Sequence, residues 1–112
     1  MTTLSKTPSP PYYAVIFSSI RTTLNDGYDT TANRMLELAS QQPGFLGADS
    51  AREDIGITVS YWKDLTSIQN WKNQTEHVQA QKNGQEHWYA EYNIKIAKVE
   101  RSYGFEIHSS LE

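Results

Sequence analysis

The sequence predicts a small α+β domain whose elements follow the order strand, helix, strand, strand, helix, strand. Three observations lead to this prediction. The 112 residues of the chain leave room for one domain. Stretches rich in β-branched and aromatic residues alternate with stretches whose apolar residues recur at helical spacing. Clusters of Pro, Gly, Asn and Asp separate these stretches, as turn residues do.

The first strand and the first helix are marked by a change of pattern. Tyr12–Ile20 is an unbroken run of aromatic and β-branched residues that prolines precede and Asn25-Asp26-Gly27 follows. Pro43-Gly44 ends the helix that begins near Tyr28, after about three turns. Its apolar face is formed by Ala32, Met35, Leu36 and Ala39.

An antiparallel hairpin is predicted next, from Phe45–Arg52 and Ile55–Trp62 around a turn at Glu53–Gly56. The second strand alternates apolar with polar or small residues, which gives it one apolar face. That face carries Ile55, Ile57, Val59 and Tyr61.

The second helical region is predicted at Asp64–Lys82, but with a break inside it. Asn73 followed three residues later by Glu76 resembles a capping box, which starts a new helix. One or two further helical turns are predicted at Gln85–Tyr92, with Trp88 and Tyr92 stacked one turn apart. The last strand is predicted at Asn93–Phe105, and residues 106–112 form a tail.

This element order is the ferredoxin-like arrangement, with a four-stranded antiparallel sheet and helices on one face only. The other face needs cover, and a second copy of the sheet is the simplest cover. Only 38% of the residues are apolar, so the core is small and a homodimer is expected. We predict a flexible N-terminal arm at 1–11, one domain at 12–105 and a C-terminal tail at 106–112.

Composition excludes several classes of function. The chain has no Cys, hence no disulfide, thiolate metal site or thiol nucleophile. Its net charge is −3 with dispersed Lys and Arg, which argues against nucleic acid. No run of about 18–20 apolar residues predicts a membrane span, and the first residues do not read as a signal peptide. The three His are not spaced as zinc ligands, so we expect a cytoplasmic protein with no metal.

Several segments resemble the antibiotic biosynthesis monooxygenase family. The resemblance extends from Tyr12 to about Phe105, over nearly the whole predicted domain. The segments that carry it are Pro43-Gly44-Phe45, Tyr61-Trp62-Lys63-Asp64, Ile68-Gln69-Asn70-Trp71, Glu76-His77 with Gln81, Trp88-Tyr89 and Val99-Glu100-Arg101-Ser102-Tyr103. It implies ferredoxin-like protomers that pair sheet to sheet into a dimeric α+β barrel, with a pocket between each sheet and its helices.

The resemblance also implies a class of reaction. Characterised members of the family oxidise polyketide anthrones or quinols with O₂ and without a cofactor, and another branch binds and degrades haem. Cofactor-free oxygenation requires a pocket that binds an electron-rich aromatic molecule, helps it lose a proton and stabilises the resulting anion. We therefore expect a small aromatic substrate and O₂ as partners, and no cofactor.

The family's functional residues match this chain only in part. Trp71 matches a helix Trp found in both branches. The anthrone oxygenases carry Asn four residues before that Trp and Tyr six residues after it, where this chain has Ser67 and His77. The haem degraders carry their iron-ligating His at the position of Gln81, so the resemblance disfavours haem.

His77 is the candidate catalytic residue. If the capping box is real, His77 lies in the first turn of the second helical piece, where exposed N–H groups and the helix dipole disfavour imidazolium. A neutral His is what a general base near pH 7 requires. The alternative is a half-exposed or hydrogen-bonded structural residue.

Six further residues are candidates for substrate binding. Trp71 and Trp62 would stack on a planar substrate, or else pack in the core. Tyr hydroxyls would contact a phenol or enolate if strand register turns them towards the pocket. Arg101 would balance an anion, or pair with Glu100. The tyrosines in question are Tyr13, Tyr61 and Tyr103.

These residues lead to two hypotheses about function. The first is a cofactor-independent monooxygenase acting with O₂ on a small aromatic, quinol or polyketide-like substrate. The alternative is a non-catalytic dimeric barrel that binds a small ligand or has a structural role. A pocket filled by its own side chains would favour the alternative.

Overall fold

The computed structural model describes residues 3–107, apart from the side chain of Thr75. Residues 1–2 of the predicted arm and 108–112 of the predicted tail lie outside the described residues. In chain order the elements are β1 (Tyr12–Arg21), α1 (Tyr28–Ser40), β2 (Phe45–Arg52), β3 (Gly56–Trp62), α2 (Leu65–Lys72), α3 (Thr75–Asn83), a π-helical turn η1 (Gly84–Trp88) and β4 (Tyr89–Val99).

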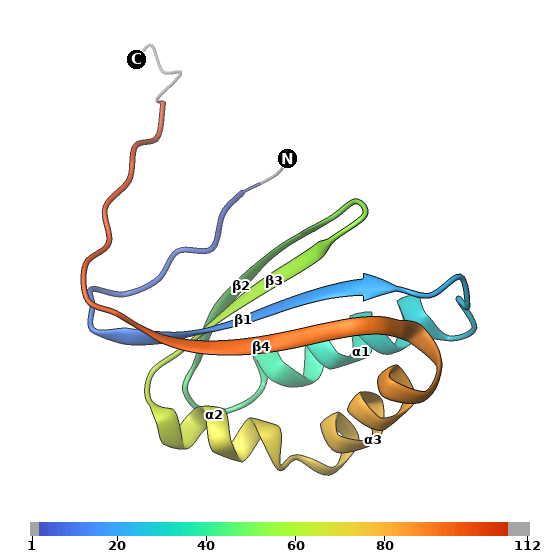
Figure 1. The fold of residues 1–112 in the computed structure, drawn as a ribbon. Helices are drawn as coiled ribbons and strands as arrows, with labels where there is room; N and C mark the ends of the chain where they lie inside the picture. Colours follow the sequence, from blue (N-terminus) through green and yellow to red (C-terminus); the bar gives the residue numbers. More distant parts are fainter. Residues whose placement is uncertain (1–2, 108–112) are drawn as a thin grey trace.

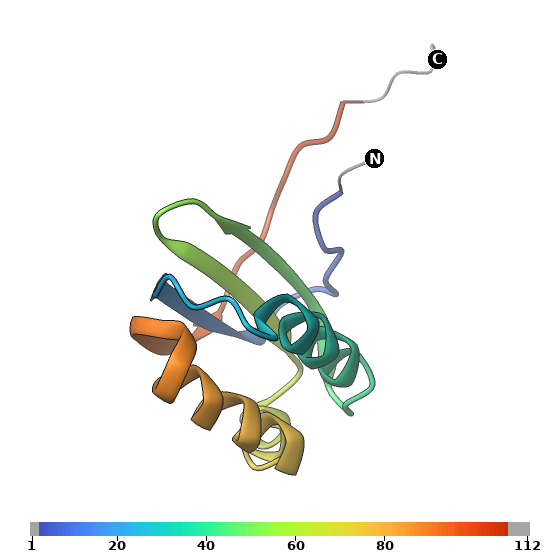
Figure 2. The ribbon, with the colours of Figure 1, turned by 90° about the vertical axis from the view of Figure 1, so that its right-hand side faces the viewer.

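The four strands form one antiparallel sheet in the order β2-β3-β1-β4. All three α-helices lie on one side of this sheet, and the chain leaves on the other side at both ends (Figures 1 and 2). We call these the helix side and the open side. The prediction of a ferredoxin-like α+β fold is confirmed.

The strand register decides which side chains face the helices. Tyr13 pairs with Trp62, and Val15 pairs with Ser60 on β3 and Ile96 on β4. Tyr13 and Val15 pack against the core beneath the helices, so their cross-strand partners also face the helix side. Alternate residues point to the open side, since neighbours along a strand face opposite ways. They include Tyr12, Ala14, Ile16, Ile57, Val59 and Tyr61.

The core lies between the sheet and the helices α1 and α2. Trp62 has no exposed surface and packs with Ala39 of α1 and Ile68 of α2. Gly44, just before β2, has a φ of 87°, and a Cβ built there would lie 2.6 Å from the Ser67 Cβ. A residue without a side chain is therefore needed where this loop passes the start of α2.

The last strand differs from its prediction at both ends. Expected at Asn93–Phe105, it begins at Tyr89 and ends at Val99. Val99 pairs with Tyr12, the first residue of β1, so the residues after Val99 have no strand beside them in this protomer. The length of β1, not the composition of β4, sets where the last strand ends.

The helical segment predicted at Gln85–Tyr92 is confirmed only in its first half. Only the turn η1 is helical, and Tyr92 belongs to β4. Tyr92 contacts Phe17, with ring centroids 5.4 Å apart, and Trp88 contacts Tyr28, with centroids 5.7 Å apart. The predicted stacking of Trp88 on Tyr92 is replaced by contacts to β1 and α1, because pairing with β1 places Tyr92 in the sheet while Trp88 stays in η1.

The N-terminal arm contacts β2 and the open side. The Ser5 backbone N–H donates to Asp49 Oδ1 at 2.8 Å, and the Ser5 hydroxyl donates to the Ala48 carbonyl at 2.7 Å. The hydroxyls of Thr7 and Tyr12 lie 2.9 Å apart. The hydrogen bonds of Ser5 tie the arm to β2, at one edge of the sheet.

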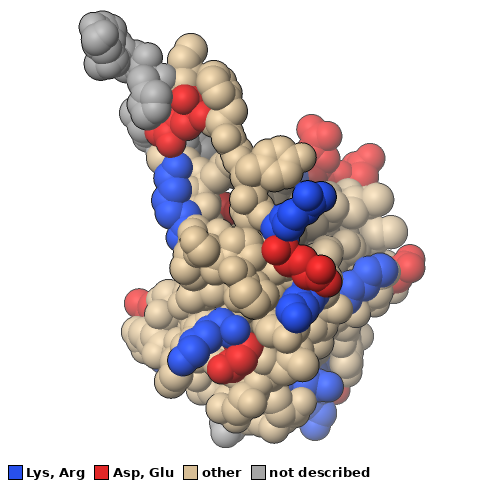
Figure 3. All heavy atoms as spheres, turned by 90° about the vertical axis from the view of Figure 1, so that its left-hand side faces the viewer, with Lys and Arg blue, Asp and Glu red and all other residues tan. Residues whose placement is uncertain are grey.

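Two properties of the surface bear on possible partners. On the face that Figure 3 shows, basic and acidic side chains are interspersed, without a broad area of one sign. Within residues 3–107, no helix combines the length and the apolar character needed to cross a membrane.

Candidate functional site

The junction between α2 and α3 places the candidate catalytic residue. Asp64 caps α2 by accepting a hydrogen bond from the Ser67 N–H at 2.8 Å. The predicted break is confirmed, but Asn73 ends α2, and Gln74 is the N-cap of α3. The Gln74 side chain accepts a hydrogen bond from the His77 N–H at 2.8 Å. His77 therefore lies in the first turn of α3, as the sequence predicts.

Three aromatic rings form a stack on the helix side. The ring centroids of Trp62 and Trp71 are 6.1 Å apart at an interplanar angle of 25°, and those of Trp71 and His77 are 4.2 Å apart at 12°. Phe45 meets Trp62 edge-on at 5.3 Å. We call Trp62, Trp71 and His77 the stacked column. It runs from a fully buried indole to a half-buried imidazole.

The surroundings of His77 define its charge and its tautomer. Burial lowers the pKa of His77, and the hydrogen bond to the Trp71 carbonyl partly opposes this shift. The imidazole is therefore neutral at pH 7. Nδ1 lies 3.0 Å from the Trp71 carbonyl oxygen, which can only accept a hydrogen bond, so Nδ1 carries the proton. Nε2 then carries the lone pair.

The polar atoms at the outer end of the column are accessible. Neither His77 Nε2 nor Trp71 Nε1 forms a hydrogen bond to any described residue. Every fully buried side-chain nitrogen or oxygen atom in the described part of the chain has a partner, so these two atoms are in contact with solvent. The column thus offers one acceptor and one donor to a ligand.

Two apolar side chains of β4 are uncovered on the helix side of the sheet. Ile94 and Ile96 are partners of Phe17 and Val15, and they face the helix side while 43% and 54% exposed. Val15 and Trp71 pack against the same core cluster.

Two clefts of the described surface lie elsewhere. One, of about 240 Å³, lies between α1 and α3, and the other, of about 120 Å³, lies near the far end of β1 and β4. None of the predicted site residues lines either cleft. The space around Trp62, where the sequence predicts a pocket, is filled by Phe45, Trp71 and the core residues.

The predicted tyrosines fall on different sides of the sheet. Tyr13 lies on the helix side and packs against the core. Tyr61 lies on the open side, where its hydroxyl donates to Asp49 Oδ2 at 3.2 Å and its ring meets Tyr12 edge-on. Burial, and then the hydrogen bond to Asp49, raise the pKa of Tyr61. The sheet separates Tyr61 from the stacked column.

Arg101 and Tyr103 lie beyond the last strand. They belong to an extended segment that follows Val99, and Tyr103 is 95% exposed. The structure does not bring either residue to the column of its own protomer (Figure 1).

Sequence reasoning missed two contacts in the first turn of α3. Gln74 was passed over because Gln is an uncommon N-cap residue, although its position three residues before His77 was visible. The ion pair of Arg34 with Glu76, at 2.9 Å, joins residues 42 positions apart, and no local pattern predicts it.

No metal site is formed by the described residues, since no three His, Asp or Glu side chains among them lie close enough to hold an ion. Gln81, at the position where the resemblance places a haem ligand, lies on α3.

Comparison with known proteins identifies the family. The family model described as antibiotic biosynthesis monooxygenase matches residues 11–83, more than half of the chain. The chain belongs to the antibiotic biosynthesis monooxygenase family. It is 53% identical over 100 residues to the uncharacterized protein YqjZ of Bacillus subtilis (strain 168), with 88% of each chain covered.

Solved structures share the fold of this family member at low sequence identity. SnoaB of Streptomyces nogalater, a cofactor-independent oxygenase, superposes with a TM-score of 0.71 at 10% identity, covering 83% of this chain and 97% of its own. Rv0793 of Mycobacterium tuberculosis superposes with a TM-score of 0.73 at 7% identity, covering 83% of this chain and 99% of its own. Likeness at this level of identity establishes the fold of the chain.

Proposed function

We propose that this protein is a cofactor-independent monooxygenase that uses O₂ to oxidise a small aromatic, quinol or polyketide-like substrate, with His77 as the proton acceptor. Membership of the monooxygenase family and the likeness to the oxygenase SnoaB support this class of reaction. The observation that carries the proposal is the imidazole of His77, which is neutral, stacked on Trp71 and has an accessible Nε2.

For an anthrone-type substrate the reaction balances without a cofactor. The CH₂ carbon gives a proton to His77 Nε2, and the resulting carbanion gives one electron to O₂. The substrate radical and superoxide combine to a peroxide, which takes the proton back from the imidazolium. Loss of water leaves a ketone, so one oxygen atom enters the product and the other leaves as water.

The stacked column suits the first of these steps. A general base must be unprotonated at the working pH, and a neutral imidazole meets this condition. Trp71 holds the ring from one face, and its carbonyl holds Nδ1, so Nε2 points in one direction. The apolar surface at Ile94 and Ile96 would hold a planar substrate beside it.

Oxygen uptake tests the proposal. The purified protein is incubated with an anthrone and, separately, a quinol, and uptake is measured above the spontaneous rate. We expect uptake by the native chain and by His87→Ala, whose histidine is exposed and lies 3.8 Å from Glu86. We expect none with His77→Ala. Equal rates for the native chain and His77→Ala would refute the role of His77.

A second candidate function is binding of a small ligand without catalysis. The filling of the predicted pocket by Phe45, Trp62 and Trp71 favours it. In that case an aromatic ligand quenches the tryptophan fluorescence of the native chain more than that of Trp71→Phe, while neither the anthrone nor the quinol causes O₂ uptake. The two measurements on one sample separate the candidates.

Haem degradation is disfavoured by the chemistry of Gln81, because an amide is a poor ligand for iron. Titration with haemin is expected to give no stoichiometric Soret band. A sharp band that reaches its plateau at one haemin per chain would reverse this conclusion.

We further propose that the protein acts as a homodimer through its open side. Ile57 on this side is 45% exposed and Ile20 is 41% exposed. A sheet with one uncovered apolar face is stabilised by packing against another layer, and a second copy supplies an identical one.

The segment after β4 supports a partner on the same side. It extends away from the sheet on the open side (Figure 1), and its apolar residues recur at every second position. Tyr103, Phe105 and Ile107 are 95%, 92% and 81% exposed. In a dimer this segment, with Arg101, would contact the partner.

Sedimentation equilibrium tests the dimer. Ile57→Lys places a charge on the open side and is expected to give monomers. Leu36→Lys, at a residue of α1 that is 54% exposed, is the matched control and is expected to leave the dimer intact. A native chain that sediments as a monomer at all concentrations would rule out this assembly.

A further inference from the structure

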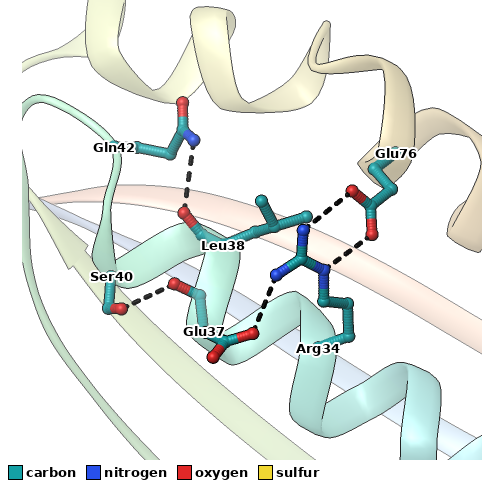
Figure 4. Close-up of polar contacts among 6 residues, drawn as sticks. All are labelled: Arg34, Glu37, Leu38, Ser40, Gln42 and Glu76. Atoms are coloured by element: carbon teal, nitrogen blue, oxygen red, sulfur yellow. Dashed lines mark hydrogen bonds and ion pairs between the residues drawn. The ribbon is translucent and has the colours of Figure 1, made fainter.

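A forked ion pair joins α1 to the first turn of α3 (Figure 4). Arg34 Nε donates to Glu76 Oε2 at 2.9 Å, and Nη2 donates to Glu76 Oε1 at 3.3 Å. The third nitrogen, Nη1, donates to Glu37 Oε1 at 2.8 Å on its own helix. Two parallel hydrogen bonds to one carboxylate fix an orientation as well as a distance.

The helix α3 lies largely at the surface. Apart from Thr75, whose side chain is not described, none of its residues is fully buried. The cleft of about 240 Å³ lies between α1 and α3, and both Arg34 and Glu76 line it. The two helices are therefore not closely packed here, and the ion pair crosses the gap between them.

Glu76 is the residue directly before His77. Successive residues of an α-helix are about 100° apart around its axis, so a carboxylate held on one side sets the direction of the next side chain. His77 must keep this direction to remain 4.2 Å from Trp71 with its Nδ1 on the Trp71 carbonyl.

We propose that Arg34 is a positioning residue for His77: by holding Glu76 it sets the rotation of α3 and keeps the imidazole stacked on Trp71 with Nε2 free. Its catalytic significance rests on the proposed function of His77. The stacking itself is measurable whether or not the protein is an oxygenase. Gln74 caps the same turn by accepting a hydrogen bond from the His77 N–H, and so also helps to hold His77 in place.

Proton NMR of the histidine rings gives the direct test. Stacking on Trp71 shifts the ring protons of His77 upfield, and the spectrum of His77→Gln identifies them among the three histidines. We expect Glu76→Ala and Arg34→Ala to move these signals towards the values of an exposed histidine. Arg34→Lys keeps the charge but not the fork, and we expect an intermediate shift.

The matched control is Glu37→Ala. It also removes a carboxylate from Arg34, but one on the same helix, so the link to α3 remains and the shifts of His77 are expected to stay unchanged. All four substitutions are on the helix surface, and circular dichroism checks that the fold is kept. Unchanged His77 signals in Glu76→Ala, or equal changes in Glu37→Ala, would overturn the proposal.

A pH titration of the His77 signals separates two effects of Glu76: its effect on the position of the imidazole and the effect of its charge. Removing the negative charge of Glu76 would by itself lower the pKa of His77, because the carboxylate favours the imidazolium. Loss of stacking admits water and raises the pKa towards 6.5. We expect the pKa to rise in Glu76→Ala, and a fall would show that Glu76 acts through its charge alone. If O₂ uptake is absent in the native chain while these shifts occur, only the proposed function fails.

Discussion

Two aromatic clusters lie at the two ends of the helix side, and they differ in how many of their polar atoms are hydrogen-bonded. At the far end of β1 lies a second group of rings, which we call the distal cluster: Phe17, Tyr28, Trp88, Tyr89 and Tyr92. There Trp88 Nε1 donates to the Asp26 carbonyl at 2.9 Å, and the Tyr89 hydroxyl donates to Tyr28 at 3.3 Å. Arg21 lies 3.4 Å above the Tyr28 ring.

The stacked column has similar rings, but two of its polar atoms have no hydrogen-bond partner among the described residues. Trp62 Nε1 donates to the Ser60 hydroxyl at 2.9 Å, whereas Trp71 Nε1 and His77 Nε2 bind no described residue. Aromatic content alone does not mark a site, since both clusters have it. The hydrogen-bonding atoms that the described residues leave unused distinguish the column from the distal cluster.

The largest expected effect is on stability, and it applies to both clusters. Trp62→Ala and Trp88→Ala remove side chains that are 0% and 7% exposed, and each is expected to lower the free energy of unfolding by about 3–5 kcal/mol. Trp71→Ala, at a half-buried residue, is expected to cost less. Urea unfolding measures all three, and a larger loss for Trp71 would place the core elsewhere.

The column is expected to make stability depend on pH near neutrality. The pKa of His77 in the folded chain is below its usual 6.5, so as pH falls below 6.5 the unfolded chain binds a proton first and stability is lost. One proton gives a slope of at most about 1.4 kcal/mol per pH unit. Urea midpoints from pH 8 to pH 5 should show a shallower slope in His77→Gln, and identical slopes would contradict a lowered pKa.

The distal cluster is expected to respond at alkaline pH instead. Burial, and then the hydrogen bond to Tyr28, raise the pKa of Tyr89 above its usual 10, so stability is lost as pH rises above 10. Tyr89→Phe removes this dependence and costs about 1 kcal/mol at pH 7 through the lost hydrogen bond. Unfolding at pH 7 and pH 10.5 compares the two chains. O₂ uptake should be the same in both.

Much of the fold could be predicted from the sequence because it depends on local patterns. Periodicity and turn residues predict the order of elements, the hairpin and the break between α2 and α3. The break in turn predicts that His77 lies in the first turn of α3. The end of β4 could not be predicted, because it depends on where β1 begins at Tyr12.

It was harder to predict whether the side chain of each candidate site residue faces the helix side or the open side of the sheet. Tyr61 and Trp62 are neighbours in the sequence, yet one faces Asp49 on the open side and the other is in the core. Strand register decides this, and a shift by one residue reverses it. The stacking of His77 on Trp71 depends on the angle between two helices, and contacts distant in the sequence set that angle.

The link between α2 and α3 consists of Asn73 and Gln74 alone. Because a helix turns by about 100° per residue, deleting or inserting a single amino acid there would present a different α3 side chain to Trp71. A change in the length of this loop would then replace the side chain that faces Trp71 by another one, while the sheet stays unaltered. Homologues with a shorter or longer connection at this point are expected to have diverged in chemistry even where their Trp is retained.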